Sequence, residues 1–106
     1  MNKQTQKAIA YAQNALSFIF LDANVSNTCN AVYLFGSAVR GEMEKDSDID
    51  LFFDFDEDGK KEIIINAAIQ RFYHSQDFQK WKLMGFTYIF SIKVGKLKEW
   101  ELKTSV

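Results

Sequence analysis

The chain contains no proline, one cysteine, one histidine and five glycines in its 106 residues. A single cysteine excludes an internal disulfide and a zinc site built from several cysteines. It fits the reducing cytoplasm, which is where we expect the protein to reside. The first residues are polar and lead into an amphipathic pattern, unlike a signal peptide. No apolar run approaches the roughly 20 residues that cross a membrane, so no membrane partner is expected.

The sequence also lacks an excess of charge of either sign. Its 13 basic and 14 acidic residues give a net charge of −1, which disfavours the basic surface of a protein that binds nucleic acid. In contrast, 47% of the residues are hydrophobic and ten are phenylalanine, enough for one packed core. Without a repeat or a linker, we predict a single domain over residues 1–106 and leave open whether Val106 is the natural end.

Residues 32–55 hold the most informative pattern. An apolar strand over residues 31–35 is followed by Gly36-Ser37, ten further residues and a second strand that opens with Asp48-Ile49-Asp50. Residues two apart in a strand share a face, about 6.6 Å apart along the backbone, so Asp48 and Asp50 are expected to point the same way. Two carboxylates about 5 Å apart repel by roughly 3 kcal/mol. A divalent cation such as Mg²⁺ or Mn²⁺ reverses that sign, so we predict a metal site at this pair.

The Gly36-Ser37 turn is expected to form the other half of the site. Glycine permits a close turn, Ser37 is expected to cap a short helix, and N–H groups at a helix N-terminus attract anions. Arg40 suits a phosphate by its geometry, although an ion pair with Glu42, Glu44 or Asp46 is an equally good interpretation. A phosphate seat that faces a metal seat indicates nucleotide chemistry. The alternative is a plain strand-to-helix turn followed by an exposed acidic edge.

The rest of the chain alternates helical and strand periods. Helices are predicted over residues 4–21 and 60–75, a strand over 85–94, and the start of a helix over 96–106. Residues 22–30 are predicted to form a loop and residues 77–83 a connecting segment. The buried stripe of the second helix is expected to comprise Ile63, Ile64, Ala67, Ala68, Phe72 and Tyr73. Ile49, Leu51, Phe53 and Phe55 are expected to face the helices. We predict an α+β fold of two layers, with a small mixed sheet of three to four strands backed by two long helices.

The central motif resembles the nucleotidyltransferase superfamily that includes DNA polymerase beta, and in it the small minimal nucleotidyltransferases. The resemblance rests on Leu34-Phe35-Gly36-Ser37, Arg40-Gly41-Glu42 and Ser47-Asp48-Ile49-Asp50-Leu51. It implies a nucleoside triphosphate, with ATP the expected donor, bound at Gly36, Ser37 and Arg40. It also implies Mg²⁺ or Mn²⁺ on the catalytic pair Asp48 and Asp50, and transfer of a nucleoside monophosphate to a hydroxyl acceptor.

The resemblance further implies a partner. Small relatives are often antitoxins that transfer AMP to a tyrosine of a partner HEPN toxin, so a protein hydroxyl is the first acceptor we expect. A small molecule and an RNA end stay open as acceptors. The aromatic side chains Trp81, Phe86 and Trp100 are candidates for a partner or homodimer surface, or for the core.

The chain departs from the family pattern at one position. Active members usually carry a third carboxylate on the strand after the second long helix, and residues 86–94 hold neither Asp nor Glu. The matching position is expected near Ile89 or Ser91, and Glu99, Glu101 or a partner protein are candidates to replace the missing acid. The alternative function is therefore a nucleotide- or partner-binding domain that has kept the fold and lost turnover.

Overall fold

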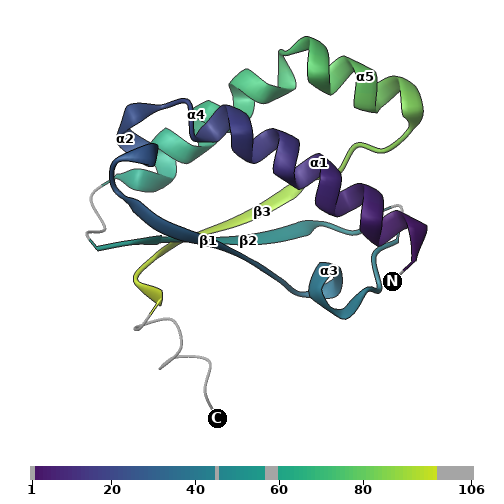
Figure 1. Cartoon of the computed structure of the whole chain (residues 1–106), viewed down its shortest axis with the longest axis horizontal. Coiled ribbons are helices and arrows are strands. Elements are labelled where there is room, and N and C mark those ends of the chain that lie inside the picture. Colours follow the sequence, from purple (N-terminus) through teal and green to yellow (C-terminus); the bar gives the residue numbers. More distant parts are fainter. Residues whose placement is uncertain (1, 45, 57–59, 98–106) are drawn as a thin grey trace.

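The computed structural model describes residues 2–44, 46–56 and 60–97 (Figure 1). Over these residues the chain forms five helices and three strands. In order they are α1 (Lys3–Ile19), α2 (Ala23–Ser26), β1 (Cys29–Phe35), α3 (Ser37–Arg40), β2 (Ile49–Phe55), α4 (Lys61–Tyr73), α5 (Gln76–Met84) and β3 (Phe90–Gly95). None of these helices is long and apolar enough to span a membrane.

The three strands form one mixed sheet in the order β1-β2-β3. β1 runs antiparallel to β2, with Phe35 opposite Asp50, and β2 runs parallel to β3, with Asp50 opposite Ser91. The return from β2 to β3 passes through α4 and α5, because parallel neighbours need a long crossover. The central strand of the sheet thus carries Asp50, and Asp48 directly precedes it.

Helices α1, α4 and α5 gather on one side of the sheet (Figure 1). The side chains of β2 that face them are all buried, namely Ile49, Leu51, Phe53 and Phe55. Val32 and Leu34 of β1 and Phe90, Ile92 and Val94 of β3 pack against the same core. The predicted two-layer α+β fold and the predicted apolar face of β2 are therefore confirmed. We call this the inner face of the sheet, and the opposite one the outer face.

The two long helices bury side chains against the inner face of the sheet. α1 buries Tyr11, whose ring stacks on Phe90 with centroids 5.4 Å apart. The stripe predicted for α4 was right at Ala68 and Phe72 and wrong at Ile63 and Ala67, which are exposed. Its buried side chains are Ile65, Ala68, Ile69 and Phe72, whereas Ile63 is 66% exposed. The observed set has the spacing i, i+3, i+4, i+7 of a helix that faces a core.

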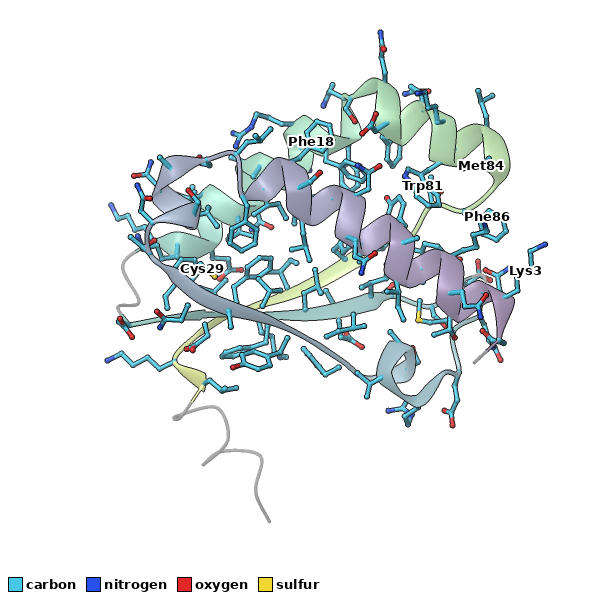
Figure 2. All side chains as sticks on the ribbon, in the orientation of Figure 1. Lys3, Phe18, Cys29, Trp81, Met84 and Phe86 are labelled. Carbon is cyan, nitrogen blue, oxygen red and sulfur yellow. The ribbon has the colours of Figure 1, made fainter. Side chains whose placement is uncertain are left out.

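The segment after α4 was predicted wrongly. Residues expected to connect two elements form α5, which Ser75 caps by accepting a hydrogen bond from the Phe78 N–H at 3.1 Å. Gly85 ends it with a φ of 75°. Trp81 anchors α5 to α1 by donating from Nε1 to Asn14 Oδ1 at 2.8 Å (Figure 2).

Two further boundaries differ from the sequence-based expectations, and a third prediction is not tested. β3 begins at Phe90, five residues later than predicted, although the alternation of side chains begins at Phe86. The loop predicted over residues 22–30 contains α2, which Asp22 caps by accepting from the Asn24 N–H. The helix expected over residues 96–106, with Trp100, Glu99 and Glu101, lies almost wholly outside the described residues.

Candidate active site

The bend after β1 brings Gly36 against the carboxylate of Asp50. Gly36 has a φ of 71° and a ψ of −146°, a conformation open almost only to glycine. A Cβ built on it would overlap Asp50 Oδ2 and lie 3.1 Å from Asp50 Cγ. The expected pairing of the Gly-Ser turn with an acid of the second strand is therefore present, and a side chain at position 36 is excluded twice, by conformation and by space.

The two acids of the motif hold different places. Asp50 lies within β2 on the outer face and is half-buried, whereas Asp48 lies just before the strand and is exposed. Between them, the Ile49 N–H donates to the Ile89 carbonyl at 2.8 Å, which fixes the start of β2 against the segment that leads into β3. Strand geometry therefore determines the direction of Asp50, and the loop before it determines that of Asp48.

Ser37 was expected to cap α3, and this was wrong. Gly36 occupies the cap position and no side chain caps the helix. The Ser37 hydroxyl instead donates to the Met43 thioether at 3.1 Å. Because sulfur is a weak acceptor, this hydroxyl can exchange it for a stronger one at little cost. α3 has four residues, so an anion at the bend would depend on nearby N–H groups more than on a helix dipole.

Met43 itself is held by the start of α1. Its N–H donates to the buried Thr5 hydroxyl at 3.1 Å, and its carbonyl accepts from Asn2 Nδ2 at 3.3 Å. The side chain of Met43 is 1% exposed. The loop after α3 is thus fixed to α1 by both backbone groups of one residue, and through its sulfur it positions the Ser37 hydroxyl.

Arg40 makes the ion pair that the sequence offered as an alternative to phosphate binding. Its Nε lies 3.1 Å from Glu42 Oε2, and both side chains are largely exposed. Exposed pairs of this kind contribute little stability, about 0.2–1 kcal/mol, so Arg40 can leave Glu42 for a better partner. Gly41 ends α3 in the left-handed conformation, as expected.

The β3 side of Asp50 carries a hydroxyl where a third acid was sought. Ser91 is the residue opposite Asp50 in the parallel ladder, and Lys93 is opposite Phe52 on the same outer face. Lys93 is exposed and was not identified from the sequence. The sequence shows that Lys93 and Ser91 share a face of the strand. Whether that face lies beside the acids depends on the β2–β3 register, which the sequence alone does not give.

Asp54, near the end of β2, is half-buried, and its Oδ1 accepts the Leu97 N–H at 2.9 Å. It lies four residues beyond Asp50 and has a structural partner of its own. We therefore keep it apart from the paired acids.

Two carboxylates fit a hard divalent cation with few protein ligands. Among the described residues, no three His, Cys, Asp or Glu side chains gather into a group that would hold a metal ion. Mg²⁺, however, usually keeps several waters and binds proteins through one or two carboxylates together with substrate phosphates. The oxygen chemistry of Asp48 and Asp50 suits this mode and does not suit a closed structural metal site.

Comparison with known proteins agrees with this geometry. The model of a nucleotidyltransferase domain family matches residues 20–105. No curated protein and no solved structure matches the chain. The matched region contains the Gly36 bend, both acids of the motif and all three strands. α1 lies wholly before the matched region but packs into the same core. The chain therefore belongs to the nucleotidyltransferase domain family.

Proposed function

We propose that this protein transfers a nucleoside monophosphate from a nucleoside triphosphate, with ATP as the donor, to a hydroxyl group. The observation that supports this most directly is the contact between the Asp50 carboxylate and the Gly36 bend. It joins an acid that suits a cation to a turn whose N–H groups suit phosphate. Family membership supports nucleotidyl transfer in general, and the donor, the acceptor and the metal are our proposals.

The reaction is a displacement at phosphorus. The acceptor oxygen bonds to the α-phosphorus, the bond from that phosphorus to the bridging oxygen breaks, pyrophosphate leaves, and the acceptor proton passes to solvent. Asp48 and Asp50 would hold Mg²⁺ or Mn²⁺, which when bound neutralises phosphate charge and orients the leaving group. The N–H groups at Gly36 and Ser37 bind phosphate oxygens, and the Ser37 hydroxyl moves from the Met43 sulfur to one of them.

In this proposal two cations complete the phosphate seat, one at the end of α3 and one on β3. Arg40 exchanges Glu42 for a phosphate, which offers its guanidinium two acceptor oxygens. Lys93 projects from the outer face one position beyond Ser91 on that face, and its long side chain supplies a positive charge on the β3 side. Both act by binding and orienting the triphosphate, the main contribution that proteins make to phosphoryl chemistry.

For the acceptor we propose a hydroxyl on a protein partner of the HEPN type, following the small relatives that the sequence motif resembles. The test is to incubate the protein with α-labelled ATP and Mg²⁺ or Mn²⁺, with and without candidate partner proteins. Label is expected on the partner, and Asp50→Asn is expected to abolish it. Asp54→Asn is the matched control, since it changes the same group on the same face and should keep the label. Equal labelling by both variants would contradict the role of Asp50.

The second candidate function is a nucleotide-binding domain without turnover, which the hydroxyl of Ser91 opposite Asp50 favours. Ser91→Asp distinguishes the two, because it adds a carboxylate beside Asp50. We expect it to tighten Mn²⁺ binding by about tenfold, measured by calorimetry. If the native chain binds Mg·ATP without transferring label and Ser91→Asp gains transfer, the native protein is a binding domain. If neither protein binds metal or nucleotide, both functions are wrong.

A further inference from the structure

A hollow of about 540 Å³ lies beside the loop that leads to Asp48 and Asp50. Its walls come from that loop (Asp46 and Ser47), from the end of α4 and the start of α5 (Tyr73 and Phe78), and from residues 87–89 before β3. Its volume is within the range of small-molecule sites, roughly 300–1,000 Å³. The proposed transfer reaction makes no use of it.

Aromatic rings form much of its lining. Tyr73 and Phe78 meet edge to face with their ring centroids 5.1 Å apart. Tyr88 is 6% exposed, and its hydroxyl donates to Gln4 Oε1 at 2.6 Å, so this ring is held from the other side. Three aromatic rings thus line the hollow, and a π-system attracts a cation that lies over its face.

The charge of the lining is negative. Asp46 is its acidic residue, and no lysine, arginine or histidine lines the hollow among the residues that the structure describes. Such a lining repels phosphate, so the triphosphate of the proposed reaction does not belong here. A cation would gain from the carboxylate and from the aromatic faces together.

We propose that this hollow binds a small organic cation, an amine or a quaternary ammonium group on a compact body. The hydroxyls of Ser47 and Thr87 are available for polar substituents, and Ile89, which is 69% exposed, offers an apolar rim to alkyl groups. Cations of this class combine the charge and the apolar surface that the lining accepts, whereas metal ions need more oxygen ligands than one carboxylate.

The site is joined to the catalytic loop by short connections. Ser47 precedes Asp48, and its Oγ accepts the Glu44 N–H at 2.9 Å. Ile89 accepts the Ile49 N–H, the residue between the two acids of the motif. A ligand in the hollow would therefore touch Ser47 and Ile89, which adjoin the start of β2. Binding of the ligand would restrict the motion of Asp48.

The test is a titration of the full chain with choline, followed by amide chemical shifts and without nucleotide or metal. We expect saturable shifts centred on Ser47, Thr87 and Ile89. The neutral carbon isostere 3,3-dimethylbutan-1-ol should bind about tenfold more weakly, because it has the same shape and no charge. Sodium chloride at the same ionic strength is the blank. Equal affinity for choline and its isostere, or shifts that neither saturate nor cluster, would overturn the proposal.

Two variants locate the charge. Asp46→Asn is expected to weaken choline binding about fivefold or more, a modest electrostatic effect at an exposed acid. Asp56→Asn removes the same charge beyond the other end of β2 and should leave the affinity unchanged. Equal effects of the two would show that choline responds to net charge and not to this hollow. Because no nucleotide is present, a failure here says nothing against the transfer reaction, and the labelling test is likewise independent of this one.

Discussion

The two faces of β2 differ in the chemistry of the side chains they carry. On the inner face Ile49, Leu51, Phe53 and Phe55 are each at most 2% exposed and pack under the helices. On the outer face Phe52 is also buried, but Asp50 and Asp54 on either side of it are half-buried, one against Gly36 and the other accepting the Leu97 N–H. Since side chains alternate along a strand, burial of one face determines where the other face points. The apolar core of this protein therefore sets the position of an acid that it never touches.

The largest expected effect breaks the inner face. Phe53→Ala removes a fully buried ring and should lower the free energy of unfolding by about 3–5 kcal/mol. Tyr33→Ala removes a ring of similar size from the outer face, where the side chain is 41% exposed, and should cost about 1 kcal/mol. Urea unfolding of both variants measures the difference. Similar losses would mean that the two faces do not divide stability as we describe.

A smaller loss is expected at the bend that meets the outer face. Gly36→Ala forces a side chain into a positive-φ position and onto the Asp50 carboxylate, and should cost about 3 kcal/mol. Gly85→Ala is the matched control, since Gly85 has a φ of 75° and nothing within 4 Å of an added Cβ. It should cost about 1–2 kcal/mol, from conformation alone.

Nucleotide binding gives a second test of the same two glycine variants. Gly36→Ala should weaken Mg·ATP binding measured by calorimetry, whereas Gly85→Ala should leave it as in the native chain. If the two variants lose equal stability and equal affinity, the contact at Asp50 has no energetic role.

The smallest effect concerns the hydroxyl proton of Tyr11, on the helix that covers the inner face. Burial raises the pKa of Tyr11 well above its ordinary value, with the nearby Tyr73 as a second cause. The unfolded chain then loses this proton first, near pH 10. The contribution of Tyr11 to the free energy of unfolding is therefore constant below that pH and falls as the pH rises further. Tyr11→Phe should cost about 1 kcal/mol at pH 7, through the lost hydrogen bond to the Tyr88 carbonyl.

Unfolding measured at several pH values between 8 and 11 checks the sign. The Tyr11→Phe variant should show a shallower alkaline decline than the native chain, because one proton fewer is released on unfolding. Parallel curves would show that Tyr11 does not titrate differently in the folded protein.

Much of the fold could be predicted from local patterns. The alternation along β2 identified its inner face, and the spacing in α1 identified a helix. α4 was misaligned because Ile63, Ile64 and Ile65 follow one another, and a run of apolar residues does not say which one is buried. α5 was missed because it buries no residue, so its cap at Ser75 was the only strong signal it offered.

The parts of the site that lie close together in the sequence could be predicted, and the parts that come from distant segments could not. Gly36 and Asp50 lie on two antiparallel neighbours, and the motif between them is short, so their contact could be expected from sequence. The place of Ser91 and Lys93 depends on the parallel register of β3, which two helices of crossover separate from β2. That register comes from tertiary packing, which no short window of sequence contains.

Asn14 uses both ends of its side-chain amide to attach α5, since Nδ2 donates to Asp77 and Oδ1 accepts from Trp81. α5 has no buried residue, so this clamp and two aromatic side chains hold it to the body of the protein. Detachment of α5 is therefore a low-energy excursion, and its backbone protons should exchange with deuterium sooner than those of α4. Each excursion would also remove Phe78 from the wall it shares with Tyr73, so that wall depends on Asn14 together with the ring contacts of Phe78.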